Sequence, residues 1–225
     1  MPPPRLDKLE RLLAELKQEG IVDPAVLAAI QRVPRELFVP PECRPHAFRN
    51  IPLPIGERQT ISQPFVVALM TQALTLSGGE TVLEIGTGSG YQCAILAELA
   101  TAVISLERFE SLSASARRRL DQLGYQNVRL IVGDGSLGYP PLAPYDAIVV
   151  TAASPRVPQP LIDQLADGGR LVLPVGSPFS QELVLYRKRA GELLSTPLGS
   201  VRFVPLVGEA AWKQEETEQF TEDLR

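Results

Sequence analysis

Three short polar motifs, each placed after an apolar run, have residue types that could bind a nucleoside. The first is Glu84-Ile85-Gly86-Thr87-Gly88-Ser89-Gly90, which begins at the end of the run 81–85. Glycines at alternate positions let the chain turn sharply and let a ligand approach backbone amides at the start of a helix. Glu107 follows the next run, about 20 residues further on, where a carboxylate can accept both hydroxyls of a ribose. Gly133-Asp134-Gly135 follows the third run, and its carboxylate is placed to meet a purine edge.

Each motif alone has an ordinary explanation as a tight turn, an acid at a helix start or a turn residue. Their occurrence after three consecutive apolar runs instead predicts a nucleoside site. The glycine spacing is G-x-G-x-G and not the G-x-G-x-x-G of dinucleotide-binding proteins, which argues against a nicotinamide-dependent oxidoreductase. The sequence has no G-K-[ST] and no G-x-S-x-G, which excludes a P-loop and weakens a hydrolase interpretation.

The elements that must position these motifs alternate along the chain. Apolar runs at residues 81–85, 102–106, 128–132, 147–151 and 171–175 are separated by stretches that predict helices at 91–99, 112–123 and 161–165. This alternation predicts an α/β fold, with a doubly wound, mostly parallel sheet that carries helices on both faces. Runs at 182–187 and 201–206, with no long helix between them, predict an antiparallel strand pair at the sheet edge.

The ends of the chain differ from this block in composition. The sequence has 21 prolines, and none lies between Phe65 and Tyr139. Helices are predicted at residues 6–19, 24–32 and 64–76, and the proline-rich stretch 33–64 is expected to be irregular. We therefore divide the chain into three parts. Residues 1–64 hold N-terminal helices and a substrate-side loop segment, 65–208 form the core, and 209–225 form an acidic tail.

The amino-acid composition limits the kinds of partner and metal ion that the protein could bind. The 225 residues include 22 basic and 26 acidic ones, a net charge of -4, which argues against nucleic acid as a partner. One histidine and two cysteines argue against a zinc site, so no metal is expected. No apolar run is long enough to span a membrane, and no N-terminal segment resembles a signal peptide. We expect a monomeric cytoplasmic protein that binds neither membranes nor nucleic acid.

Longer stretches carry a family resemblance. The motif ending in Gly88-Ser89-Gly90-Tyr91 resembles motif I of class I S-adenosylmethionine-dependent methyltransferases. Residues 53–64, 132–135, 145–153 and 201–208 resemble the protein-L-isoaspartate O-methyltransferase family, and the similarity runs from about Leu6 to Gly208. The segment Thr60-Ile61-Ser62-Gln63-Pro64 discriminates best, because many methyltransferases share motif I.

The resemblance implies an enzyme that transfers a methyl group from S-adenosyl-L-methionine to the free carboxylate of L-isoaspartyl residues in damaged proteins and peptides, leaving S-adenosyl-L-homocysteine. The methyl ester closes to a succinimide, whose hydrolysis returns some normal aspartate. The implied cofactor-binding residues are Glu84, Gly86, Thr87, Gly88, Ser89, Gly90, Glu107, Gly133, Asp134 and Gly135. Ile61, Gln63, Val204, Pro205 and Leu206 are the implied substrate-binding residues.

We expect Thr60 and Ser62 to be catalytic, by orienting the incoming carboxylate with their hydroxyls. A carboxylic acid of pKa about 4 is ionised at neutral pH, so the reaction needs no general base and suits a chain with one histidine. Read locally, Ser62 could equally be a helix N-cap ahead of Pro64. A methyltransferase acting on another carboxylate or small molecule, and a non-catalytic S-adenosylmethionine-binding module, remain as alternatives.

The sequence departs from the family pattern at a few positions. These are Phe48 and Asn50, the pair Glu57-Arg58, and Ala211. They fall mostly in the expected substrate-facing loop, so they bear on peptide preference and rate more than on cofactor binding.

Overall fold

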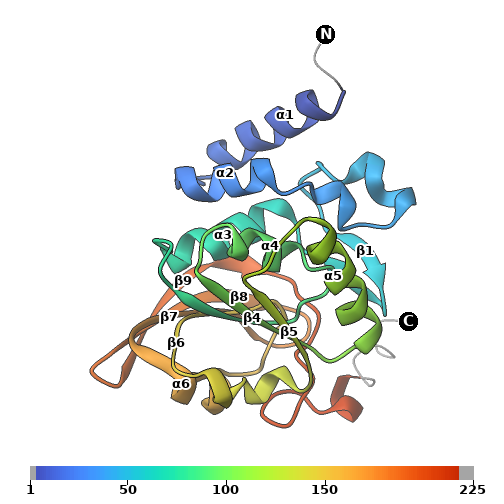
Figure 1. Ribbon diagram of the computed structural model, residues 1–225. Helices are drawn as coiled ribbons and strands as arrows, with labels where there is room; N and C mark the ends of the chain where they lie inside the picture. Colours follow the sequence, from blue (N-terminus) through green and yellow to red (C-terminus); the bar gives the residue numbers. More distant parts are fainter. Residues whose placement is uncertain (1–3, 218–225) are drawn as a thin grey trace.

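A computed structural model describes residues 4–217 of the chain (Figure 1). The N-terminal part begins with helices α1 (Pro4–Gln18) and α2 (Pro24–Arg32), which are amphipathic and lie outside the helix layer that covers the sheet. Asp23 caps α2 as its sequence position predicts, because its side chain accepts hydrogen bonds from the amides of Ala25 and Val26. Leu12, Leu16 and Ile30 belong to the same hydrophobic core as the sheet.

The stretch 33–64 is more regular than its prolines suggest, so the expectation of an irregular segment is wrong in part. Two short 3-10 helices, η1 (Arg35–Leu37) and η2 (Pro41–His46), precede an antiparallel hairpin of β1 (Leu53–Gly56) and β2 (Gln59–Ile61). The turn residues Glu57 and Arg58 both have positive φ, 47° and 57°. Such turns usually carry Asn-Gly, so this hairpin has no ordinary sequence signal.

A seven-stranded sheet forms the centre, in the order β5-β4-β3-β6-β7-β8-β9. The strands from β5 to β7 are parallel, and β8 and β9 are antiparallel additions at one edge. The strands are β3 (Thr81–Ile85), β4 (Ala102–Glu107), β5 (Val128–Val132), β6 (Tyr145–Val150), β7 (Leu165–Gly176), β8 (Gln181–Arg189) and β9 (Glu192–Val201). The predicted doubly wound α/β fold with an antiparallel C-terminal pair is confirmed.

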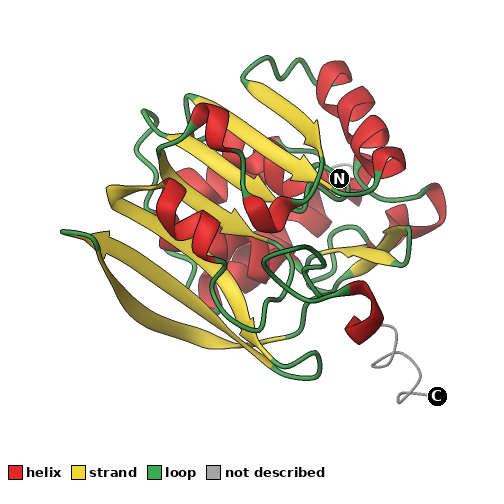
Figure 2. Cartoon of the chain, turned by 90° about the horizontal axis from the view of Figure 1, so that it is seen from below, coloured by secondary structure: helices red, strands yellow, loops and turns green. Residues whose placement is uncertain are grey.

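Helices cover both faces of this sheet (Figure 1; Figure 2). One face carries α3 (Pro64–Leu74), α4 (Tyr91–Ala97) and α5 (Glu110–Gln122), and the other carries α6 (Gln159–Gln164). Side chains alternate accordingly: Val82 belongs to the core on the first face and Leu83 to the core on the second. Short 3-10 helices η3 (Gly135–Leu137) and η4 (Pro140–Leu142) follow β5. None of the helices within 4–217 is long and apolar enough to cross a bilayer.

The prediction of a strand at residues 201–206 is wrong. The last strand, β9, ends at Val201, and the chain then leaves the sheet edge and crosses to the end of β6. There Ala153 donates its N–H to the carbonyl of Val204, and Leu206 donates to the carbonyl of Ala153, both at 2.7 Å. Pro205 has no N–H for a ladder, and the apolar side chains around it line a cavity instead of a sheet face.

Candidate active site

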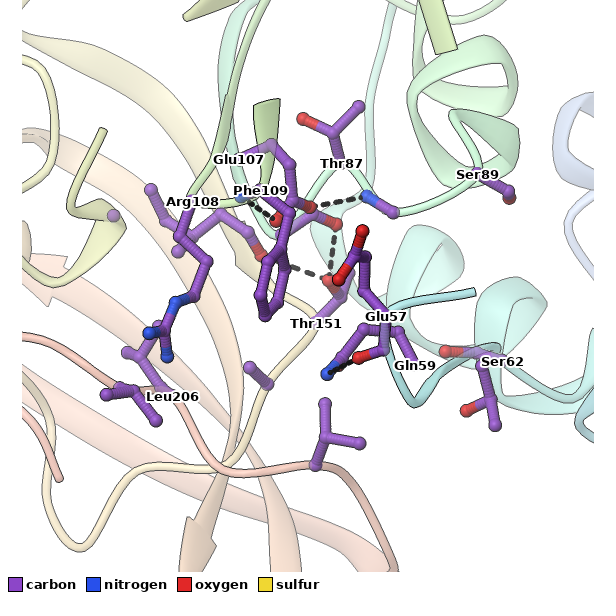
Figure 3. A pocket seen from close by; sticks show the side chains of 18 of the residues that line it. Glu57, Gln59, Ser62, Thr87, Ser89, Glu107, Arg108, Phe109, Thr151 and Leu206 are labelled. Carbon is purple, nitrogen blue, oxygen red and sulfur yellow. Dashed lines mark hydrogen bonds between the residues drawn. The ribbon is translucent and has the colours of Figure 1, made fainter. Parts of the chain in front are cut away.

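A cavity of about 480 Å³ opens where the strand order reverses, at the carboxyl ends of β3, β4 and β6 (Figure 3). Its size lies within the range of small-molecule sites, and this end of a doubly wound sheet is where such folds bind ligands. The chain reaches it from several directions. The lining includes residues 57–62, 85–89, 106–109, 151–152 and 204–207.

The glycine loop forms one wall of this cavity. Gly86, Gly88 and Gly90 all have positive φ, and a side chain at Gly86 would overlap the hydroxyl of Thr151. Thr151 donates that hydroxyl to the carbonyl of Gly86 at 2.7 Å, which fixes the loop from the neighbouring strand end. The loop thus holds its backbone along the cavity wall, and a side chain at Gly86 would collide with Thr151.

Glu107 faces the same cavity and is 6% exposed. Its Oε2 accepts the N–H of Gly88 at 2.8 Å, and its Oε1 accepts the N–H of Phe109 at 3.0 Å. A carboxylate offers about four acceptor positions, so two backbone bonds leave capacity for two further donors. The two remaining acceptor positions match the two hydroxyls of a ribose. Glu107 also lies beside the glycine loop, as its predicted role requires.

Glu84 lies below the cavity and does not line it. The side chain is fully buried, and its Oε2 accepts the hydroxyl of Ser105 at 2.5 Å, which in turn pairs with the hydroxyl of Thr87 at 2.6 Å. Burial raises the pKa of Glu84 to about 8, and the nearby Glu107 makes a smaller contribution in the same direction. Thr87, at the other end of this chain of hydroxyls, lines the cavity, whereas a contact of Glu84 itself with the cofactor stays a prediction.

Gly90, Gly133 and Asp134 also lie outside the lining. Gly90 lets the start of α4 pack closely, because a Cβ there would be 3.1 Å from the Cβ of Ala116 on α5. Asp134 caps η3 through the N–H of Ser136 at 2.9 Å, and its Oδ2 accepts the N–H of Glu209 at 2.7 Å. Only Gly135 of this motif borders the cavity, so a direct purine contact by Asp134 stays a prediction.

The β1–β2 hairpin and the start of α3 form the opposite wall. Thr60, Ile61 and Ser62 line the cavity, and neither the Thr60 nor the Ser62 hydroxyl bonds to another residue within 4–217. Ser62 is not the N-cap of α3. Gln63 holds that position without a side-chain cap bond, and Asn50 accepts the N–H of Phe65 at 2.9 Å instead. Both hydroxyls are therefore available to a ligand.

A second cavity, of about 660 Å³, adjoins the first. Thr60, Ser62, Thr151 and Val204 line both. Gln63 borders only the second, and Pro205 and Leu206 only the first, so the predicted substrate residues gather around this junction. The second cavity has apolar side chains from Phe65, Val66, Leu69, Leu198 and Phe203, and Glu19, Ser200 and Arg202 also line it.

Sequence reasoning missed several lining residues. Thr151, Tyr91, Arg108 and Phe109 all border the first cavity. Thr151 had a usable signal, because it is the last residue of the fourth run, 147–151, at the end that corresponds to Glu107 after the second run. His46 lies exposed in η2, away from both cavities. Within residues 4–217 no three His, Cys, Asp or Glu side chains are grouped as a metal site would require.

Fold and cavity together define a class I S-adenosylmethionine-dependent methyltransferase: a doubly wound sheet whose glycine loop and buried acid, Glu107, meet at the strand ends. Residues 7–211 match the family model of protein-L-isoaspartate(D-aspartate) O-methyltransferase. The chain belongs to this family.

Relatives and solved structures agree. A protein-L-isoaspartate O-methyltransferase of Methanoculleus marisnigri is 53% identical over 213 residues, which are 95% of this chain and 97% of the relative. One from Syntrophobacter fumaroxidans is 55% identical, covering 88% and 93% of the two chains. A solved protein-L-isoaspartate O-methyltransferase has a TM-score of 0.81 at 31% identity, with 90% of this chain and 67% of that one covered.

A further solved structure, a protein-L-isoaspartate O-methyltransferase from Plasmodium falciparum, was crystallised with S-adenosyl-L-homocysteine. It has a TM-score of 0.78 at 26% identity, covering 88% of this chain and 98% of that one. The chain is therefore an S-adenosylmethionine-dependent enzyme that methylates L-isoaspartyl residues and starts their repair. The interpretation as a non-catalytic module is excluded.

Proposed function

We propose that this chain methylates the isoaspartyl carboxylate at the junction of its two cavities, with Thr60 and Ser62 orienting that carboxylate. The observation that carries the proposal is the shared lining. The glycine loop and Glu107 border the first cavity, apolar side chains border the second, and the two hydroxyls border both. A cofactor in the first cavity and a peptide in the second would meet at these hydroxyls.

The residues around the first cavity fit S-adenosyl-L-methionine. Glu107 has acceptor capacity for the ribose, and Gly86 and Gly88 expose backbone beside it. Ile85, Leu106 and Phe109 supply apolar surface. When bound, the cofactor supplies a methyl group on a positively charged sulfur, which leaves as a neutral thioether.

The chain's own residues contribute alignment. The substrate carboxylate is ionised at neutral pH, so one of its oxygens can form the new C–O bond as the C–S bond breaks. Hydroxyl donors from Thr60 and Ser62 would hold the carboxylate by charge-assisted hydrogen bonds. Alignment of this kind can contribute about 7–11 kcal/mol to lowering the barrier. No proton has to be removed from the substrate, which suits a cavity without a histidine in its lining.

The test uses labelled S-adenosyl-L-methionine and paired peptides that differ only in an aspartyl or isoaspartyl linkage. We expect base-labile label on the isoaspartyl peptide alone. In Ser62→Ala we expect kcat to fall about 10- to 100-fold, the worth of one hydrogen bond to a charged group, while the Kd for S-adenosyl-L-homocysteine stays within about twofold. A collapse of cofactor affinity in this variant would show instead that Ser62 serves the cofactor side.

The substrates are isoaspartyl-containing proteins and peptides. We propose further that the protein acts as a monomer in the cytoplasm, without nucleic acid or membrane partners. Its modest negative charge argues against nucleic acid as a partner. Light scattering coupled to size exclusion would test the monomer, with a mass near 24.5 kDa as the expected result.

A further inference from the structure

Arg35 is a buried cation beside the active site that the sequence interpretation did not single out. Its side chain is 1% exposed, and no carboxylate of the described residues forms an ion pair with it. Burial lowers the pKa of Arg35 to about 10, so the group remains charged at neutral pH. Burying a charge without an opposite partner is costly, and a hydrophobic residue of similar size would avoid that cost. The contacts of this guanidinium therefore need a reason.

These contacts join the two walls of the cavity. Nη2 of Arg35 donates to the carbonyl of Ser62 at 2.7 Å, and Nε donates to the carbonyl of Ala47 at 2.9 Å. The guanidinium lies over the ring of Tyr91, 4.7 Å from its centroid, and Phe38 meets the same ring edge-on at 5.5 Å. Ser62 belongs to the wall formed by the hairpin and the start of α3, which we call the substrate wall. Tyr91 follows the glycine loop and belongs to the opposite wall, which we call the cofactor wall.

We propose that Arg35 is a positioning residue for methyl transfer, which holds the Ser62 peptide against Tyr91 and so directs the Ser62 hydroxyl into the junction of the two cavities. The inference rests on the proposed role of Ser62. It also explains how that hydroxyl is aimed, since Ser62 follows β2 and precedes the N-cap of α3, and the Arg35 guanidinium bonds to its carbonyl.

An arginine suits this task better than a lysine. Its planar fork can donate in two fixed directions while its face stacks on an aromatic ring, whereas an ammonium group is a point charge on a flexible stem. Ala47 and Ser62 lie in separate loop segments, and one guanidinium bonds to both. A displacement of about 1 Å in a positioned group can cost about 100-fold in rate, so a small change at Arg35 should be visible in kcat.

The test begins with Arg35→Lys, compared with Arg170→Lys as a matched control. Arg170 also donates to two backbone carbonyls, those of Leu74 and Thr75, but at the far end of α3 from the cavities, and it also pairs with Glu80 at 3.3 Å. We expect both variants to lower Tm. Only Arg35→Lys should lower kcat, by about tenfold or more, with the Kd for S-adenosyl-L-homocysteine within about threefold of the parent. An unchanged kcat would overturn the inference.

A double-mutant cycle with Ser62→Ala separates this inference from the proposed function. If Arg35 acts through the Ser62 hydroxyl, Arg35→Lys should change kcat less than twofold in the Ser62→Ala background, while its effect on Tm persists. Equal kcat losses in both backgrounds would overturn the positioning role. A Ser62→Ala variant with the parent's kcat would overturn the proposed role of Ser62 itself. If Arg35→Lys does not fold, the uncharged Arg35→Gln enters the same cycle with the same criteria.

Discussion

The two walls of the active site are built differently. The cofactor wall consists of loops at adjacent strand ends, joined by hydrogen bonds such as the one from the Gly88 N–H to the Glu107 carboxylate. The substrate wall consists of the β1–β2 hairpin and the segment that crosses to Ala153. Both line the cavity, although they lie far apart in the sequence. The cofactor wall therefore follows from local motifs, and the substrate wall depends on long-range contacts.

The walls differ also in how their polar groups are used. On the cofactor side the groups are committed: Thr87, Ser105 and Glu84 form a buried chain of hydrogen bonds. On the substrate side the hydroxyls of Thr60 and Ser62 have no partner among the residues described. Changes to the cofactor wall should thus alter affinity or stability, whereas changes to the substrate wall should alter turnover.

The largest expected effect comes from Gly86→Ala. Its φ of +95° strains any other residue, and the added Cβ would overlap the Thr151 hydroxyl that holds the loop. The loop can relieve this strain and overpacking only by moving from its place in the cavity wall. We therefore expect the affinity for S-adenosyl-L-homocysteine, measured by calorimetry, to fall about 100-fold. Gly124→Ala is the control, because its φ is +81° but nothing lies within 4 Å of the new Cβ. Equal affinity in both variants would contradict a close-fitting cofactor wall.

An effect of similar size is expected on the free energy of unfolding, which should depend on pH because of the buried Glu84. Its pKa rises from an ordinary 4.5 to about 8 in the fold, mainly through burial. Between these values the folded state keeps a proton that the unfolded state loses, so the free energy of unfolding falls as pH rises, by up to about 1.4 kcal/mol per pH unit, and levels off above about 8.

Glu84→Gln removes this titration. We expect its free energy of unfolding, from urea titrations at pH 5 to 8, to fall less steeply with pH than that of the parent. The two slopes should differ by about 1 kcal/mol per pH unit. Parallel slopes for parent and variant would mean that Glu84 is ionised in the folded protein.

Glu107→Gln should have a smaller effect, confined to the cofactor. The amide keeps the shape of the side chain but replaces one acceptor oxygen by a donor and removes the charge. We expect the Kd for S-adenosyl-L-homocysteine to rise about tenfold, with kcat at saturating cofactor within about threefold. Glu110→Gln, an exposed acid in the first turn of α5, is the control and should change neither. A fall in kcat without a change in Kd would contradict a role of Glu107 in cofactor binding.

The cofactor wall could be predicted from sequence because its information is local. A strand, a glycine turn and a helix adjoin along the chain, so Gly86–Ser89 and Glu107 were found together. Asp134 fitted the same pattern, but it lies outside the cavity lining and its Oδ2 accepts the N–H of Glu209. That contact joins residues far apart in sequence, which no local spacing can indicate.

The substrate wall was predicted from the family resemblance and not from the local sequence pattern. Residues 201–206 read as an edge strand because their apolar side chains match one, whereas the chain crosses to Ala153. The hairpin tip Glu57-Arg58 lacks the glycine that would have announced it. Arg35 was missed because a buried arginine in a proline-punctuated loop has no periodic pattern around it.

The smallest predicted effect concerns a hydrogen bond between the hairpin tip and α5, the helix that follows the Glu107 loop. The Ser111 hydroxyl on α5 donates to Oε1 of Glu57 at 2.6 Å (Figure 3 shows Glu57 beside the glycine loop). Both side chains are exposed, so the bond should be worth about 0.5–1 kcal/mol. Ser111→Ala should raise the Kd for S-adenosyl-L-homocysteine about two- to fivefold, and Ser195→Ala, exposed on β9, should not change it.

Glu57→Ala removes the same bond from the other side. If the bond is what holds the hairpin against the cofactor wall, the double variant should bind no more weakly than the weaker single one. Additive losses would mean that the two side chains act separately, and the two walls would then be coupled only through the chain of contacts around Arg35 and Ser62.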